Sequence, residues 1–358
     1  MSTQPEVRSA ARRALVTGGA GYLGSTLVRW LGARGWQVAV LDDLSNGHAD
    51  ALPAGVPLHR GDVRDAAAVD AALALCGPRP DVIVHLAGLI QVGESVLQPE
   101  RYLSVNVDGT QVVLAAARRA GVPAFVQASS AAVLATLPAR AAGDAATTLD
   151  RLDESAPIGP ESPYGLSKVR AEAALAAAVA ETAGGGACLS GASLRLFNLA
   201  GSLYGCAERH EPETHLIPLA LGAALGQRPP LLCFGDDFPT PDGTPLRDYV
   251  HIADVVAAFE AAALQALAAS AAGTPRVEVY HLGSGVGRSV RDVVAAVERV
   301  VGRPVPHSFV PRRAGDCAAL VADPSRLATV LGVTPDPDLG RMVRDAAVAL
   351  GWSASSAV

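Results

Sequence analysis

Tyr164 and Lys168 are the residues of this sequence whose types and spacing most directly suggest chemistry. The chain has 29 lysines and arginines, and Lys168 is its only lysine. A single lysine among so many arginines suggests a role that needs a compact ammonium rather than a planar fork. Tyr164 precedes it by four residues, so a helix would place both side chains on one face.

A cation close to a phenol lowers its pKa, which is ~10 when unperturbed, by favouring the phenolate. Tyr164 and Lys168 could therefore form a general base for a sugar or alcohol hydroxyl. The alternative is an exposed pair with no catalytic role. The glycine motif near the start of the chain favours catalysis.

That motif is the segment from Gly18 to Gly24, Gly-Gly-Ala-Gly-Tyr-Leu-Gly. Gly18, Gly21 and Gly24 fit G-x-x-G-x-x-G, and a start at Gly19 fits G-x-G-x-x-G. Either pattern allows a tight turn and a close backbone approach, so that the following helix can bind a pyrophosphate at its N-terminus. A plain turn between a strand and a helix is the alternative.

Asp42 follows the last of these glycines near the spacing of about 20 residues at which an acid accepts from the adenosine ribose. No arginine follows it directly to neutralise a 2′-phosphate. We therefore expect NAD rather than NADP as the cofactor.

The elements that must position these residues alternate between strands and helices. Strands are expected near 14–17, 37–41, 59–63, 81–85, 124–128 and 193–198, and helices near 22–34, 95–120 and 163–182. The helix near 95–120 could alternatively begin only after Pro99. This order predicts an α/β fold with a doubly wound parallel sheet, whose ligands lie at the carboxyl ends of the strands. Ser130 follows one strand and could bind the same hydroxyl as Tyr164, or it could be an ordinary turn serine.

The pattern changes near residue 198 to longer loops, with strands expected at 231–235 and 277–281 and helices near 252–268 and 289–301. We therefore divide the chain into an NAD-binding domain at 12–197, to which segments near 250–285 return, and a smaller, discontinuous mixed α/β lobe at 198–352. Residues 1–11 and 353–358 are expected to be tails. The segment 137–160, rich in Ala, Gly, Asp, Thr and Pro, is expected to be an exposed loop.

Composition excludes several classes of protein. A net charge of −6 argues against nucleic-acid binding. The five cysteines are scattered without a C-x-x-C, so neither a disulfide framework nor a metal site is expected. Residues 1–13 lack the apolar segment of a signal peptide, and no uncharged run approaches a membrane span. We expect a cytoplasmic protein with no membrane association.

The glycine motif, Asp42, and Tyr164 with Lys168 together resemble the extended short-chain dehydrogenase/reductase family. Within it, nearly the whole chain is similar to the UDP-glucose 4-epimerases of the galactose pathway. The stretches that carry this closer resemblance lie at 41–46, 85–88, 92–96, 197–198, 211–218, 234–240, 242–244, 247–251 and 311–316. The stretches beyond 198 discriminate best, because many nicotinamide-dependent sugar enzymes share the earlier ones.

The resemblance implies a set of contacts with NAD and a set with a UDP-sugar substrate bound by the second lobe. The NAD contacts are Gly18, Gly21, Tyr22, Leu23, Gly24, Asp42, Asp43, Asn46, Gly47, Asp62, Val63, Leu86, Ala87, Gly88, Lys168 and Phe197. The substrate contacts are Ser130, Tyr164, Asn198, His215, Leu232, Phe234, Arg247, Arg313 to Asp316, and Leu320. The arginines suit a diphosphate through their forked donors, although either could be a surface charge.

The resemblance also implies the reaction, a transient oxidation at C4 of the sugar. Tyr164 would take the proton of the 4-hydroxyl while hydride passes to NAD and later returns to the other face. Lys168 would hold the nicotinamide ribose, and Ser130 would orient the hydroxyl. A homodimer that pairs through helices such as the one carrying Tyr164 is expected.

Four departures from the family pattern bear on these expectations. Ile90 replaces a lysine, Val105 replaces an asparagine with Asn106 beside it, and Leu134-Ala135 replaces Tyr-Gly in some relatives. These three concern cofactor contacts. Leu320, where tyrosine or cysteine is frequent, concerns the sugar that the pocket accepts.

Two alternatives remain open. One is another NAD-dependent nucleotide-sugar epimerase, acting on a UDP-N-acetylhexosamine, UDP-glucuronate or a UDP-pentose. The other is a non-catalytic NAD-binding regulator. A 4,6-dehydratase or decarboxylase would want an acid after Ser130, where this chain has Ala131-Ala132.

Overall fold

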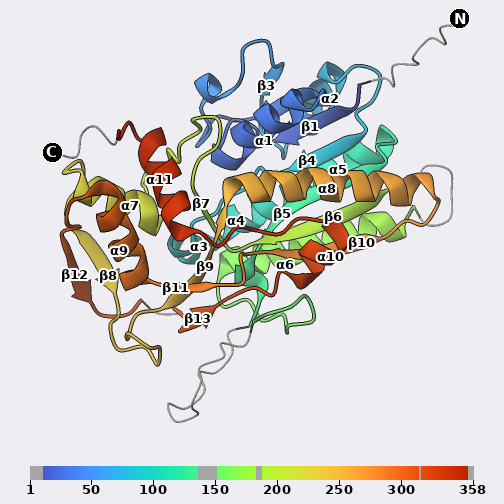
Figure 1. Ribbon diagram of the computed structural model, residues 1–358. Coiled ribbons are helices and arrows are strands. Elements are labelled where there is room, and N and C mark those ends of the chain that lie inside the picture. The colour runs from blue at the N-terminus through green and yellow to red at the C-terminus, as the bar shows by residue number, and fades with distance from the viewer. Residues whose placement is uncertain (1–10, 136–150, 183–187, 314–315, 354–358) are drawn as a thin grey trace, which may run out of the picture.

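A seven-stranded parallel sheet organises the computed structural model, which describes residues 11–135, 151–182, 188–313 and 316–353 (Figure 1). The strand order is β10-β6-β5-β4-β1-β2-β3, so the order reverses between β1 and β4. This confirms the predicted doubly wound sheet. The strands are β1 (Arg13–Thr17), β2 (Gln37–Asp42), β3 (Leu58–Arg60), β4 (Val82–His85), β5 (Ala124–Ser130), β6 (Ser190–Leu196) and β10 (Val277–Leu282).

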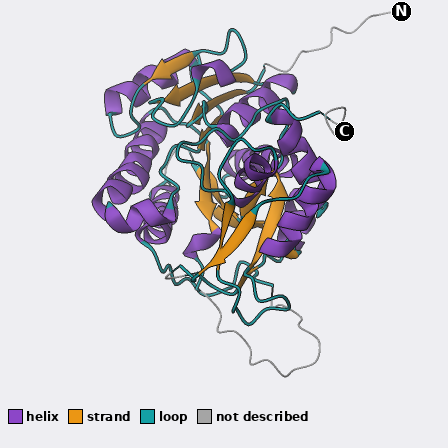
Figure 2. Ribbon diagram, turned by 90° about the vertical axis from the view of Figure 1, so that its left-hand side faces the viewer, coloured by secondary structure: helices purple, strands orange, loops and turns teal. Residues whose placement is uncertain are grey.

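Helices cover both faces of this sheet, which Figure 2 shows between two groups of helices. Successive residues of a strand point to opposite faces, and both faces are apolar here. Leu15 packs in one core and Val16 in the other, each fully buried. One face carries α1 (Tyr22–Ala33), α8 (Ile252–Ala271) and α10 (Ser325–Leu331), and the other carries α2 (Ala66–Leu75), α5 (Gly109–Arg119) and α6 (Pro163–Ala180).

The helix α8 is long and apolar enough to cross a membrane by length and composition alone. Its place in the fold explains that character. Val256 and Phe259 are fully buried, and the helix packs on β4, β5 and β6 (Figure 1). The helix α8 and the strand β10 thus belong to the large sheet and to the helices that cover it.

A second core lies beside the carboxyl ends of β4, β5 and β6. The small sheet there contains β7 (Asn198–Ala200), β9 (Leu246–His251), β11 (Gly287–Ser289) and β13 (Ala319–Leu320), and β8 (Leu231–Phe234) pairs with β12 (His307–Val310). Three helices share a core with these strands: α7 (Leu216–Ala224), α9 (Val290–Val301) and α11 (Leu339–Ala349). The element β11 runs antiparallel to β9, so this part is mixed, as expected.

The helix predicted over 95–120 is interrupted. It forms α3 (Val92–Leu97), α4 (Pro99–Leu103), a π-helical turn (Ser104–Asp108) and then α5. Pro99 disfavours helical backbone at the preceding residue, and Gln98 has a φ of −133°. The π turn carries Asn106 inward, where its side chain accepts from the Leu89 amide at 2.8 Å and donates to the Leu89 carbonyl at 3.0 Å.

The structure describes the predicted loop at 137–160 only from residue 151 onward, where it contains no helix or strand. Residues 136–150, with the predicted end residues 1–10 and 354–358, lie outside the described part of the chain. Leu152 is buried and forms a bridge with Ala322, while Ile158 forms one with Leu134. Residues 151–160 therefore form a loop, as predicted, but one that is anchored to the fold, because Leu152 packs with Leu134 and Phe197 in a small core.

Candidate active site

A cavity of about 1090 Å³ lies between the large sheet and the second core, at the carboxyl ends of the strands. Ligand pockets usually span ~300–1,000 Å³, so this one has room for more than one ligand. Each described residue that the resemblance assigned to NAD or substrate lines it. Ala314 and Gly315, within the predicted Arg313–Asp316 segment, lie outside the described residues. The individual roles stay predictions.

The glycine turn at one end of the cavity is built as a G-x-x-G-x-x-G motif. Gly18 has a φ of +69°, and a Cβ there would lie 2.6 Å from the Ala87 nitrogen. A Cβ on Gly24 would lie 2.1 Å from the Gly18 carbonyl oxygen, so α1 can pack this closely only on glycine. Gly21 caps α1. The helix N-terminus therefore opens on the cavity, where it can hold a pyrophosphate.

Asp42 ends β2 at the same side of the cavity. Its two carboxylate oxygens accept from the Ala20 and Leu44 amides, both at 2.9 Å. Burial raises the pKa of Asp42 and these two hydrogen bonds oppose the rise. A carboxylate fixed by backbone amides retains lone pairs for the hydroxyls of a ribose.

Asp62 and Arg64 form an ion pair in the same region. Arg64 also lines the cavity, so an arginine is present there although none directly follows Asp42. The carboxylate of Asp62 accepts from the Arg64 Nε at 3.0 Å, and this hydrogen bond lowers the pKa of Asp62. Arg64 is thus engaged by an acid, beside the acids Asp42 and Asp43, which suits a 2′-hydroxyl better than a 2′-phosphate.

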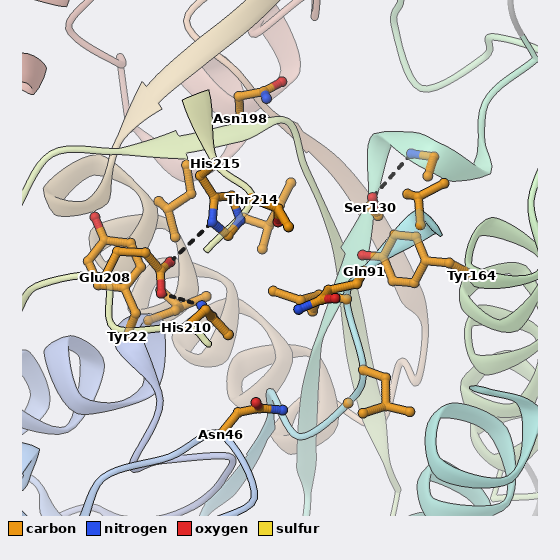
Figure 3. A pocket seen from close by; sticks show the side chains of 18 of the residues that line it. Tyr22, Asn46, Gln91, Ser130, Tyr164, Asn198, Glu208, His210, Thr214 and His215 are labelled. Atoms are coloured by element: carbon orange, nitrogen blue, oxygen red, sulfur yellow. Dashed lines mark hydrogen bonds and ion pairs between the residues drawn. The ribbon is translucent and has the colours of Figure 1, made fainter. Parts of the chain in front are cut away.

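Tyr164 and Ser130 approach each other at the far side of the cavity (Figure 3). Tyr164 follows the N-cap Ser162 and Pro163, which start α6, and Ser130 ends β5. The Ser130 hydroxyl accepts from the Ala132 amide at 3.1 Å, which leaves its proton for the Tyr164 phenol oxygen. A hydroxyl bound to both groups would sit at the carboxyl end of β5.

Lys168 lies one turn further along α6, as predicted. It is buried, and its ammonium donates to the Ala128 carbonyl at 3.0 Å. Burial lowers the pKa of Lys168 from 10.5 to about 8, and the Glu172 carboxylate opposes that shift. The ammonium lies 6.0 Å from the centre of the Tyr164 ring.

Lys168 was predicted to lower the pKa of Tyr164, but the structure indicates the opposite shift. Burial raises the pKa of Tyr164 above its usual 10, and the hydrogen bond with Ser130 opposes the rise. The phenol packs edge-on against Tyr102, 6.3 Å between ring centres, in a small core with Leu89. Withdrawal of the ring from water therefore outweighs any help from the ammonium, which is itself bound to a backbone carbonyl.

Arg247 and Arg313 approach the cavity from the second core. Arg247 donates to the Cys317 carbonyl at 3.0 Å and lies 3.7 Å from the Asp316 carboxylate. The guanidinium carbon of Arg313 stacks 3.6 Å from the centre of the Phe234 ring. Both arginines therefore carry their charge at the cavity wall, where a diphosphate would need it.

His215 faces Tyr164 across the cavity in Figure 3, with Asn198 and Thr214 close to it. Its Nδ1 lies 2.7 Å from Glu213 and 3.9 Å from Glu208. Burial lowers the pKa of His215, but these two acids outweigh it and the net shift is upward. The imidazole is therefore poised to carry positive charge toward an anionic substrate.

Sequence reasoning missed Glu208 and His210, which also line the cavity. The motif Glu-Arg-His-Glu-Pro-Glu-Thr-His, in which acids alternate with histidines, was the available signal. Among the described residues, Glu208, His210 and His215 offer ligand atoms within 4.8 Å of one another, a group able to hold a metal ion. Here each histidine is instead engaged by a glutamate, Glu208 or Glu213.

The four departures lie at this cavity. Ile90, Val105, Leu134 and Leu320 all line it. Asn106 does not replace the missing asparagine at 105, because its amide bonds Leu89 and, at 2.9 Å, the Ser167 hydroxyl. Leu320 packs against the core of Val133, Leu134 and Phe197 while it faces the cavity.

A parallel doubly wound sheet with a glycine turn at one end of its ligand cavity and a Ser–Tyr–Lys group at the other defines a short-chain dehydrogenase/reductase of the extended type. Over residues 14–283 the chain matches the NAD dependent epimerase/dehydratase family, and it belongs to that family. It is 39% identical to the UDP-glucose 4-epimerase of Rhizobium leguminosarum bv. trifolii over 349 residues, 97% of this chain and 99% of that one.

Solved structures are also similar. The UDP-glucose 4-epimerase of Brucella ovis, in complex with NAD, is 35% identical with a TM-score of 0.83, covering 96% of this chain and 99% of that one. The UDP-glucose 4-epimerase of Bifidobacterium longum, in complex with NAD+ and UDP, is 29% identical with a TM-score of 0.81, covering 97% of this chain and all of that one. The chain therefore resembles these enzymes over nearly its full length.

Proposed function

We propose that this protein is an NAD-dependent UDP-glucose 4-epimerase, which inverts C4 of a UDP-hexose through a transient 4-keto sugar. The observation that carries the proposal is that Ser130 and Tyr164 approach each other (Figure 3) at one end of a cavity whose other end is the glycine turn. The cavity of about 1090 Å³ is at the upper end of the usual range for ligand pockets, which suits a cofactor and a nucleotide sugar bound side by side. The relatives named above carry out, by their names, the same reaction.

Each step assigned to the chain follows from the position of one side chain. Ser130 donates to the 4-hydroxyl and holds it against the Tyr164 phenol oxygen, and Tyr164, as phenolate, accepts the proton of that hydroxyl. The same phenol gives the proton back when the 4-keto sugar is reduced. Because burial raises the pKa of Tyr164, forming the phenolate would need the field of the Lys168 ammonium, which would also bind the ribose of the nicotinamide. The chemistry that bound NAD would supply is the reversible acceptance of the hydride of C4.

The residues proposed to bind the substrate fall into two groups. One group would bind the diphosphate, and the other would bind the uridine and the sugar on either side of it. We assign the diphosphate to Arg247, Arg313 and His215, because these carry or are poised to carry positive charge at the cavity wall. Asp316 would accept from the uridine ribose. Asn198, Leu232, Phe234 and Leu320 would shape the space around the uracil and the sugar.

NAD contacts are proposed for the glycine turn, for Asp42 to Gly47, for Asp62 and Val63, for Leu86 to Gly88, and for Lys168 and Phe197. This supports the division at residue 198, since most of these residues precede it. We therefore propose 12–197, with the returning segments near 250–285, as the NAD-binding domain. Residues 198–352 then form the discontinuous nucleotide-sugar-binding lobe.

The experiment that tests the function needs no added cofactor, because the net reaction is redox-neutral. Purified protein is incubated with UDP-galactose, and UDP-glucose is measured by chromatography. Conversion that is lost in Tyr164→Phe supports the proposal. Binding of NAD and UDP-galactose with no conversion in any buffer between pH 6 and 9 would favour the non-catalytic regulator.

The second candidate is a 4-epimerase of UDP-N-acetylhexosamines, and Leu320 is the observation that favours keeping it. A leucine at the cavity wall leaves more room than a tyrosine would. Incubation with UDP-N-acetylgalactosamine in the same assay compares the two sugars directly.

We also propose that the protein is a homodimer of the cytoplasm. Val96 and Leu97 of α3 and Leu166 of α6 are exposed apolar side chains on neighbouring helices, which suits a partner surface. The five cysteines are free thiols, as in a reducing compartment. Sedimentation of the native protein and of Leu97→Glu tests the dimer: an unchanged monomeric mass for both would reject it.

A further inference from the structure

Glu172 lies on the catalytic helix one turn beyond Lys168, and no role follows for it from the reaction described above. Tyr164, Lys168 and Glu172 are spaced by four residues along α6, so they share one face of the helix. The Glu172 side chain is 15% exposed. A carboxylate so far from water needs partners, and the structure supplies three donors.

Those donors tie α6 to the two strands next to it. One carboxylate oxygen accepts from the Ser129 hydroxyl at 2.5 Å and from the Arg195 Nε at 2.9 Å, and the other accepts from the Arg195 Nη2 at 2.8 Å. Ser129 precedes Ser130 on β5, and Arg195 lies on β6. The bidentate contact fixes Glu172 in one orientation beside Lys168.

We propose that Glu172 is a positioning residue of the active site, which keeps the buried Lys168 ammonium charged and aligns the catalytic helix with the strand that carries Ser130. Its effect on the Lys168 charge does not depend on the substrate, whereas its effect on turnover rests on the proposed function.

Among the residues that the structure describes, other groups near Lys168 do not supply this negative charge. The titratable groups that the elements packed around α6 bring to this side are Glu94 of α3, Tyr102 of α4, His85 of β4, Arg195 of β6 and His281 of β10. The pKa of His85 falls to about 3 through burial, so it is neutral. Glu94 is bound to Arg101 and to the Tyr102 hydroxyl. Burial lowers the pKa of His281 and raises that of Tyr102, so both are also neutral.

The sign of the effect follows directly. Burial brings the pKa of Lys168 down to about 8, and the Glu172 charge is what opposes the fall. Without that charge the ammonium loses its proton at a lower pH. The Arg195 guanidinium would then lie near Lys168 without the Glu172 charge to balance it, and this second positive charge would lower the pKa of Lys168 further. Activity that needs the ammonium should therefore be lost at lower pH than in the native enzyme.

The sequence offers a direct measurement, because Lys168 is the only lysine of the chain. Biosynthetic incorporation of lysine labelled with ¹³C at the ε-carbon gives a single resonance, provided that any purification tag lacks lysine. Its shift against pH reports the protonation of Lys168 in the full-length protein. In Glu172→Gln we expect the midpoint to fall by roughly one pH unit, the low end of the effect of one nearby charge.

Three variants make the test specific. Glu172→Asp retains the charge and should restore a midpoint close to the native one. Glu181→Gln removes an exposed carboxylate at the end of the same helix, paired with Arg118, and should leave both midpoint and turnover unchanged. Glu172→Gln with Arg195→Met removes the whole pair, so the midpoint should fall less than in Glu172→Gln. If Glu172→Gln alone folds poorly because it leaves the buried Arg195 without its partner, the double variant avoids that problem and the measurement can still be made.

The kinetic measurement is the pH profile of kcat/KM with UDP-galactose. Its alkaline limb should move to lower pH in Glu172→Gln, together with the resonance. A folded Glu172→Gln protein with the native Lys168 midpoint would overturn the proposal. If the midpoint moves but no variant epimerises UDP-galactose, the charge effect is supported and the proposed function is what fails.

Discussion

The Lys168 ammonium donates to the Ala128 carbonyl at 3.0 Å and lies 6.0 Å from the centre of the Tyr164 ring. The two side chains share one face of α6, yet the ammonium is anchored to β5. Lys168 is therefore placed by the sheet and not by the phenol. Its influence on Tyr164 must act through the field of a fixed charge and through whatever ligand it binds.

Tyr164→Phe should retain NAD and UDP-sugar binding and lose most turnover, because it deletes the proton acceptor and little else. General acid–base groups typically contribute 10²–10⁴-fold. The measurement is kcat with UDP-galactose, and Tyr204→Phe, a change at an exposed tyrosine, is the control that should remain active. A loss below about tenfold would assign the base to another residue.

Lys168→Arg should be nearly as harmful although the charge is kept. The site is buried, and a planar guanidinium can neither reproduce the ammonium's bond to Ala128 nor fit the same space. Turnover and retained NAD are both measured. The reverse exchange at the exposed Arg170 of the same helix, Arg170→Lys, should be neutral, and full activity of Lys168→Arg would refute the special role of the lone lysine.

The sequence was enough to predict the sheet, the glycine turn after its first strand and the helix of Tyr164, because these depend on local patterns. Alternating apolar segments specify strands, and Gly24 is required by its contact with the Gly18 carbonyl within the same turn. The Tyr–Lys spacing is likewise a property of one helix. Each of these signals lies within about 30 residues, the length of a βαβ unit.

What the sequence could not predict depends on contacts between distant segments. The raised pKa of Tyr164 follows from burial against Tyr102, sixty-two positions earlier in the numbering, which no local pattern reveals. The buried Leu152 depends on a bridge to Ala322. The pairing of Glu172 with Arg195 joins a helix to a strand beyond it. Such contacts exist only after the chain has folded.

Asp42→Ala should weaken the retention of NAD, because it removes the carboxylate at the ribose end of the cavity. A hydrogen bond to a charged group is worth roughly 1.5–3 kcal/mol, or about ten- to a hundredfold in affinity. Bound nicotinamide per protein after purification is the measurement. The control is Asp70→Ala: Asp70 lies on α2 and forms an exposed ion pair with Arg119 of α5, so this variant should retain the native amount of bound NAD. If Asp42→Ala also retained the native amount of NAD, Asp42 would be only a turn residue.

The KM for UDP-galactose should rise with pH as His215 loses its proton. Glu213 and Glu208 outweigh burial and raise the pKa of His215 above 6.5, so the charged form persists to higher pH than in a free imidazole. Glu213→Gln should move the rise in KM to lower pH. A KM that is independent of pH from 6 to 9 in both proteins would remove His215 from the diphosphate site.

Leu320 should set the range of sugars, since it lines the cavity from β13 beside Arg247. A leucine is smaller than a tyrosine but still crowds an acetamido group, and a misfit of methylene size costs about 1–3 kcal/mol. We therefore expect UDP-N-acetylgalactosamine to be turned over roughly ten- to two-hundredfold less efficiently than UDP-galactose. Leu320→Tyr should abolish the weaker activity and spare the stronger one.

The competing explanation is that Leu320 serves mainly the core of Val133, Leu134 and Phe197, on which it packs. The two explanations differ in the ratio of kcat/KM for the two sugars. Core damage lowers both values together and lowers the melting temperature, whereas a steric role in the sugar site changes the ratio. Leu264→Tyr, a matched exchange at a more exposed leucine of α8 outside the cavity, should leave the ratio unchanged. A native ratio in a folded Leu320→Tyr enzyme would remove this residue from sugar selection.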